Sequence, residues 1–196
     1  MAQARVAPER YAQAIERFDA AHAEDPEQDA SGRPKELIYA ERMSAWLNRL
    51  APDASEALRL AARCQHIRRW AIRRSDYPAG AAGYRKWRSD EAAAHALAAK
   101  EILEKSHYEA QTIQRVQSLV RKEKLKQDPE AQLLEDVSCL VFLENYFAEF
   151  AAKHDEPTLL RILRKSWTKM SPTGQQAALG LKLPPPLRVL VEKALS

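Results

Sequence analysis

Apolar residues recur at intervals of three and four along most of this chain, and prolines separate the segments that show the pattern. The first segment begins at Pro8 and carries Tyr11, Ile15 and Phe18 at helical spacing. Proline suits the first turn of a helix, because the backbone N–H that it lacks would have no intrahelical partner there. The pattern predicts a chain built from amphipathic helices that bury their apolar faces against one another.

The same spacing predicts most of the remaining elements. Further helices are expected across Leu37 to Leu50, from Pro52 to about Ile72, from about Ser89 to Lys105, from about Glu109 to Lys126, and from Pro129 through Phe147. Loops are expected at residues 25–34 and 76–83, and short helices or turns after Pro157, Pro172 and Pro184. Alternation with a period of two is scarce, so no sheet is expected. We therefore predict an all-α, single-domain bundle over residues 1–196, with its core at about 8–153 and short C-terminal helices over 157–196.

Two further features of the sequence bear on the cellular compartment of the protein. Cys64 and Cys139 each lie in an apolar helical pattern and form no Cys-x-x-Cys pair, so both are expected to be buried thiols. The N-terminus has no apolar run typical of a signal peptide, and no apolar stretch reaches the roughly 18 residues of a membrane span. These features predict a cytoplasmic protein with no membrane partner.

Positive charge is concentrated in one segment. The chain has a net charge of +4, yet the segment from Arg63 to Arg88 has eight Arg and Lys residues against one carboxylate, Asp76, a local balance of +7. Such a concentration indicates an anionic partner. Arg69, Arg73 and Arg88 are predicted to bind phosphate oxygens. Tyr84 and Trp87, beside a glycine, are predicted to contact the rest of that ligand, although Trp87 is equally suited to anchoring a solvated loop to the core.

Three residues on separate predicted helices suggest a metal site. His66 lies within the third predicted helix, His95 within the fourth and Asp136 near the start of the sixth. Imidazoles and a carboxylate bind divalent transition metals, and helical bundles build such sites from facing helices. We therefore predict that these residues hold one ion of manganese, iron, nickel or zinc, with Glu135 and Asp136 as catalytic residues. The alternative is structural: half-buried histidines, and acidic residues that favour a helix start.

Several runs resemble one uncharacterised family of bacterial, fungal and plant proteins, a domain-of-unknown-function family. They occur in order over nearly the whole chain: Asp25-Pro26, Tyr39 to Met43, Cys64 to Trp70, Gly83-Tyr84 with Trp87-Arg88, His95-Ala96, and Leu134 to Val137 with Val141 to Glu144. Members of this family are sometimes labelled glutamyl-tRNA synthetase, and Lys169-Met170-Ser171 is similar to the start of a synthetase signature loop. No nucleotide-binding sheet is predicted, so Ser171-Pro172 is interpreted as the cap of a helix.

A more distant resemblance implies an activity. The order His66, His95, Asp136 is similar to that of the HD superfamily of all-helical, metal-dependent phosphohydrolases. It implies an HD-like fold and hydrolysis of a phosphorylated small molecule, most readily a nucleotide. The adjacent His-Asp pair that names the superfamily is absent between His66 and Asp136. Two alternatives therefore remain open: a degenerate HD-like domain that binds an anionic ligand without catalysis, and an interaction module for RNA or protein.

Overall fold

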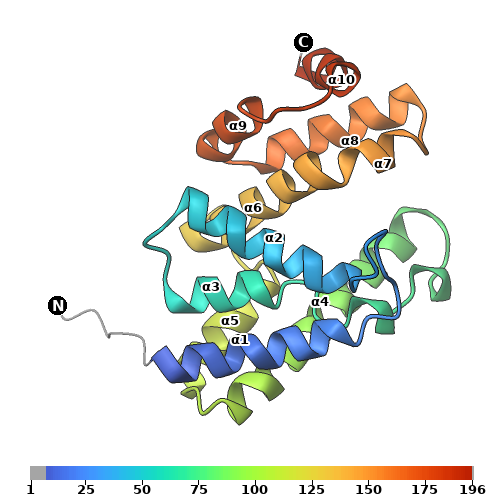
Figure 1. Cartoon of the computed structure of the whole chain (residues 1–196). Helices are drawn as coiled ribbons and strands as arrows, with labels where there is room; N and C mark the ends of the chain where they lie inside the picture. Colours follow the sequence, from blue (N-terminus) through green and yellow to red (C-terminus); the bar gives the residue numbers. More distant parts are fainter. Residues whose placement is uncertain (1–7, 196) are drawn as a thin grey trace. The chain divides into compact units, whose positions relative to one another are not determined.

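A computed structural model describes residues 8–195 of the chain, and most of these residues lie in helices joined by loops and turns (Figure 1). Between them they contain no β-strand, only an isolated bridge between Gln28 and Pro34. The α-helices are α1 (Pro8–Ala23), α2 (Lys35–Leu50), α3 (Glu56–Arg63), α4 (Gly80–Lys105), α5 (Ala110–Val120), α6 (Pro129–Asn145), α7 (Phe147–Ala151), α8 (Glu156–Lys169), α9 (Pro172–Leu179) and α10 (Pro185–Leu195), with 3-10 turns η1 (Arg69–Ala71) and η2 (Arg74–Asp76). The predicted all-α, multi-helix class is confirmed.

The chain divides into two compact units, with the boundary between Glu123 and Lys124. Unit 1 contains α1 to α5, and unit 2 contains α6 to α10. The expectation that both belong to a single domain stays a prediction. No helix within residues 8–195 is both long enough and apolar enough to cross a membrane.

Unit 1 is held together by the apolar faces of its helices. Helix α3 packs against α1, α2 and α5, and α4 packs against α1 and α5. Phe18, Met43, Leu47 and Leu58 are among the completely buried side chains. Removal of this apolar surface from water is the main driving force for folding. Helix α4 also buries two titratable side chains, Glu91 and His95.

The third helix is much shorter than predicted. It begins after Ser55, whose side chain caps it by accepting a hydrogen bond from the Leu58 N–H, and it ends at Arg63 instead of near Ile72. The chain then turns, and Arg68 adopts a left-handed conformation with φ of 54°. The indole Nε1 of Trp87 donates to the Ile72 carbonyl at 3.0 Å. This contact between residues distant in sequence helps to hold the segment in a non-helical path, which helical spacing does not reveal.

Two other boundaries also differ from the prediction. Helix α4 begins at Gly80 and not near Ser89, so Tyr84 to Arg88 lie on a helix. Gly83 is required there by close packing, because a Cβ on it would lie 1.9 Å from the Pro78 carbonyl oxygen. Helix α5 ends at Val120, before the predicted Lys126, and Lys122 and Lys124 that follow are left-handed, with φ of 56° and 55°. Compared with the prediction, the basic residues just before Ser89 lie on a helix, and Lys122 and Lys124 lie beyond the end of one.

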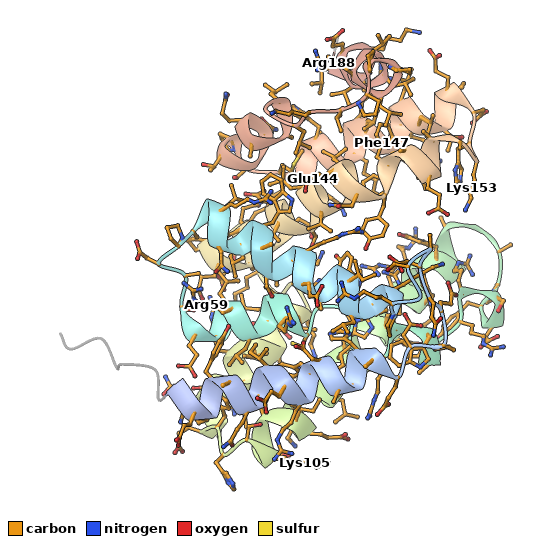
Figure 2. All side chains as sticks on the ribbon, in the orientation of Figure 1. Arg59, Lys105, Glu144, Phe147, Lys153 and Arg188 are labelled. Carbon is orange, nitrogen blue, oxygen red and sulfur yellow. The ribbon has the colours of Figure 1, made fainter. Side chains whose placement is uncertain are left out.

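Unit 2 is organised around α6, which packs against α7, α8 and α9, while α10 packs against α8. Most residues of α6 are buried, as its nearly continuous apolar sequence predicted. Phe147, labelled in Figure 2, is completely buried. Helices α6, α8 and α9 each begin with a proline in the first turn, after the capping residues Asp128, Asp155 and Ser171. The role predicted for proline at helix starts is therefore confirmed for these three.

Both cysteines are buried and unoxidised, as predicted. Burial raises the pKa of the Cys64 thiol to about 12. The thiolate is the reactive form of cysteine, so Cys64 is inert at neutral pH and acts as a small apolar side chain.

Candidate functional site

His66 and His95 lie close together in unit 1, although the first is not on a helix. His66 follows α3 in the turn that precedes η1, and its ring stacks on that of Tyr39 from α2, with the centroids 4.1 Å apart. The ring of His95, on α4, has its centroid 5.9 Å from that of His66. The prediction that both histidines are mid-helix is wrong for His66, because α3 ends before it.

Both imidazoles are neutral near pH 7. Burial, followed by the charge of Arg69, lowers the pKa of His66 well below its usual value. The same two causes, in the same order, lower the pKa of His95 to about 3. Arg69 Nη1 lies 3.2 Å from each ring nitrogen of His66. Since arginine only donates hydrogen bonds, a ring nitrogen of His66 is the acceptor, which also requires the neutral ring.

A buried carboxylate on α4 joins the arginines of this cluster. Glu91 is 1% exposed. Its Oε2 accepts a hydrogen bond from Arg88 Nη1 at 2.8 Å, and its Oε1 lies 3.4 Å from Arg69 Nε. Burial raises the pKa of Glu91, and Arg69 and Arg88 oppose that rise. Arg69 and Arg88 therefore compensate the charge of this carboxylate.

A second carboxylate approaches the cluster from α2. Glu36 Oε2 lies 3.5 Å from His66 Nδ1, and the side chain of Glu36 is 18% exposed. Burial raises the pKa of Glu36 to about 7, although the charge of Arg69 acts in the opposite direction. Neither Glu36 nor Glu91 was predicted as a site residue from the sequence. The three-residue spacing of Arg88 and Glu91 on a helix was a signal for the latter, whereas Glu36 is brought near only by folding.

A cleft of about 490 Å³ in unit 1, which we call the anion cleft, is lined by His66, His95 and Arg88 together with residues from the end of α5. Arg121, Lys122 and Glu123 follow α5 and complete its charged lining, so three cations face one carboxylate. Gln65 also lines the cleft. It is 4% exposed, and within residues 8–195 no donor is found for its Oε1.

The other predicted ligand-binding residues lie around Trp87. Its ring is mostly buried, and Arg69 and Arg88 lie over it with their guanidinium carbons 5.6 Å and 5.7 Å from the ring centroid. Tyr84 is 45% exposed, with its ring 5.7 Å from that of Trp87. Arg69, Arg73 and Trp87 line a different cleft from that lined by Arg88. The aromatic-basic segment is thus a helix anchored by Trp87, and not the solvated loop of the alternative interpretation.

Glu135 and Asp136 belong to unit 2, where both are buried. Asp136 Oδ1 accepts hydrogen bonds from Gln132 Nε2 at 3.0 Å and from the Ser171 N–H at 2.8 Å, and its Oδ2 accepts one from the Ser171 hydroxyl. Glu135 Oε1 lies 3.1 Å from Lys169 Nζ. Asp136 therefore joins α6 to the start of α9, with Ser171 as the predicted cap.

These contacts bear on how well the residues fit a metal ion. Both carboxylate oxygens of Asp136 are already hydrogen-bonded. Across residues 8–195, no three His, Cys, Asp or Glu side chains are grouped so that they could hold a metal ion. The predicted ion on His66, His95 and Asp136 stays a prediction.

The fold and the site define an all-α protein with a buried cluster of histidine, arginine and glutamate beside a cationic cleft. A family model described as a domain of unknown function (DUF4202) matches residues 12–191, and the chain belongs to that family. The predicted membership of an uncharacterised family is thereby confirmed. No curated protein and no solved structure matches the chain.

Proposed function

We propose that unit 1 binds a phosphorylated small molecule in the anion cleft, with its phosphate against Arg88, Lys122 and the edges of His66 and His95. The observation that carries this proposal is the charge of the lining, in which Arg88, Arg121 and Lys122 outnumber Glu123. Arginine and lysine are the side chains that most often bind phosphate oxygens in proteins. The volume of about 490 Å³ lies within the range of small-molecule sites.

The cations of the lining are not equally engaged. Arg88 donates to the buried Glu91, so part of its charge is compensated inside the protein. Arg121 Nη1 lies 3.8 Å from Glu123 Oε1, and both side chains are exposed, so this ion pair is weak and yields readily to a ligand. Of these two cations, Arg121 is therefore the more available to an anion.

The neutral side chains of the lining, two imidazoles and the amide of Gln65, favour a ligand that carries hydroxyls as well as phosphate. Each neutral imidazole offers one N–H donor and one acceptor nitrogen. The buried Oε1 of Gln65, for which no donor is found within residues 8–195, is suited to accept a hydrogen bond from a hydroxyl of the ligand. Nucleotides and sugar phosphates carry both kinds of group, and a nucleotide is the ligand class that we favour.

Binding of pyrophosphate and of ADP to the full chain, measured by calorimetry at low salt, tests this proposal. Lys122→Gln combined with Arg121→Gln should weaken binding by about tenfold or more, since each removes a charge-assisted contact. Lys105→Gln is the matched control, because Lys105 is an exposed cation on α4 outside the lining. An undetectable affinity for both anions, or equal weakening in the control, would contradict the proposal.

Hydrolysis of the bound ligand is the activity that the HD resemblance implies, and it is a separate proposal. It is supported by two neutral imidazoles with ring centroids 5.9 Å apart at the cleft. The test is the metal content of protein purified without a metal-binding tag, compared with His66→Ala, together with phosphate release. Near-stoichiometric manganese, iron, nickel or zinc that is lost in the variant supports catalysis. A metal-free wild type that binds ADP and releases no phosphate supports binding alone.

The third function predicted from the sequence, an interaction module for RNA, has a distinct signature. RNA binding by the basic residues would weaken steeply with salt, because each neutralised phosphate releases counterions. Tight, salt-dependent binding of RNA with no measurable affinity for ADP would replace the small-molecule proposal.

A further inference from the structure

Unit 1 contains a second cleft, of about 590 Å³, which we call the tryptophan cleft. It is lined by Trp70 and Trp87, by the carboxylates of Glu36 and Glu91, and by Arg69 and Arg73, among others. No residue lines both this cleft and the anion cleft. The two clefts therefore differ in composition and are tested independently.

Several charged residues of the tryptophan cleft are already engaged by the protein itself. The carboxylate of Asp25 accepts the backbone N–H groups of Glu27 and Glu36. Glu27 Oε2 lies 2.9 Å from Lys35 Nζ. Arg74 donates to backbone carbonyls of the loop that precedes α4. These residues fix the walls of the cleft and leave Glu36 and Glu91 as its buried acceptors.

Each of these two carboxylates has a buried oxygen without a hydrogen bond. Within residues 8–195, no donor is found for Glu36 Oε2 or for Glu91 Oε1. Arg69 Nε lies 3.4 Å from Glu91 Oε1, so the guanidinium supplies positive charge beside this oxygen but donates no hydrogen bond to it. Buried polar atoms are nearly always hydrogen-bonded in folded proteins, because leaving one unpaired is costly. His66 Nδ1 lies 3.5 Å from Glu36 Oε2 and likewise forms no hydrogen bond with it. Two unpaired acceptors in one cleft would therefore be stabilised by a donor from outside the protein.

We propose that the tryptophan cleft binds the protonated amine of a small zwitterion, with the ammonium group donating to Glu36 Oε2 and Glu91 Oε1. An ammonium has three N–H donors and no acceptor, so one such group has enough donors for both oxygens. The carbon chain of the ligand packs on Trp70 and Trp87. Arg73, which is exposed and lines the same cleft, binds the anionic end of the ligand.

The zwitterionic class follows from the charges that surround the two acceptors. Arg69 lies beside Glu91 and repels a ligand that is only a cation, whereas Glu36 and Glu91 repel one that is only an anion. A ligand with both charges can place its ammonium group beside the two carboxylates and its anionic group beside an arginine. Burial raises the pKa of Glu36 to about 7, and a nearby ammonium would lower that pKa again. Binding near neutral pH should therefore release protons.

The experiment compares γ-aminobutyrate with butyrate, which has the same carbon chain and carboxylate but no amine. Each is titrated into the isotope-labelled full chain while the indole N–H signal of Trp87 is followed. That group donates to the Ile72 carbonyl, and both residues line the cleft. We expect γ-aminobutyrate, and not butyrate, to shift the signal in a saturable way. Calorimetry in two buffers of different ionisation enthalpy should show proton release.

A pair of variants on α2 locates the binding. Glu36→Gln removes the acceptor charge with little change of shape and should weaken γ-aminobutyrate binding by about tenfold or more. Glu41→Gln on the same helix is the control, because Glu41 pairs with Arg33 and lies outside the cleft. Equal shifts with butyrate, no shift with γ-aminobutyrate, or unchanged affinity in Glu36→Gln would each overturn the inference. The comparison of the two ligands on the wild type stands even if a variant fails to fold. Neither result alters the pyrophosphate test of the anion cleft.

Discussion

Gly174→Ala should destabilise the protein, although the same change within an exposed helix normally stabilises it by about 1 kcal/mol. A Cβ at position 174 would lie 2.6 Å from Asp136 Cγ and 2.8 Å from its Oδ1. Carbon atoms in favourable contact are roughly 3.5–4.0 Å apart, so the overlap is about 1 Å. Asp136 has no room to retreat, because Gln132 and Ser171 hold both of its oxygens.

The size of the effect depends on which contacts are lost when the added Cβ is accommodated. If α9 moves by the required distance, it loses the hydrogen bonds from the Ser171 N–H and hydroxyl to Asp136. Hydrogen bonds to a charged acceptor contribute about 1.5–3 kcal/mol each. After the intrinsic gain of about 1 kcal/mol from alanine is subtracted, the net loss is about 2–5 kcal/mol.

Urea denaturation followed by circular dichroism measures this loss, and Gly180→Ala is the matched control. Gly180 ends the same helix with a φ of −78°, and the nearest atom to its Cβ would be the Ala177 carbonyl oxygen at 3.4 Å. The control should therefore be neutral or gain up to about 1 kcal/mol. In an Asp136→Ala background, Gly174→Ala should cost much less. A Gly174→Ala protein as stable as the control would refute the role given to Asp136.

The unit 1 cluster gives three further predictions. Because the pKa of His95 falls from 6.5 to about 3 on folding, the unfolded chain takes up this proton at a higher pH than the folded chain does. The free energy of unfolding therefore declines as pH drops through that range. His95→Gln should reduce this decline by roughly 1 kcal/mol per pH unit, measured by denaturation at a series of pH values. Because the pKa of Glu36 rises from 4.5 to about 7, its contribution is lost as pH rises through that range. Relative to wild type, Glu36→Gln should therefore be about 3 kcal/mol more favourable at pH 8 than at pH 4, and the reverse order would refute this. Trp87→Phe removes the hydrogen bond to the Ile72 carbonyl and should cost about 1 kcal/mol or more, measured as a lower unfolding midpoint; an unchanged midpoint would contradict this.

Much of the candidate site could be located from the sequence, but not its chemistry. The basic segment, His66 and His95 were identified by residue type, and folding brings them into one cluster. The path of the chain between α3 and α4 was predicted wrongly, because it is held by Trp87 and by the left-handed Arg68. Helical spacing carries no information about such contacts.

The sequence by itself determined the class of the fold and the starts of several helices, because apolar spacing, proline and capping residues act within a few residues of the chain. It also determined that Cys64 and Cys139 are buried. Only the tertiary structure decided which charges face which. Glu36 reaches His66 from another helix, Glu91 lies between two arginines, and Asp136 joins α6 to α9. Electrostatic and hydrogen-bond partners depend on distances across the fold, and these distances set the protonation states on which any function of this protein depends.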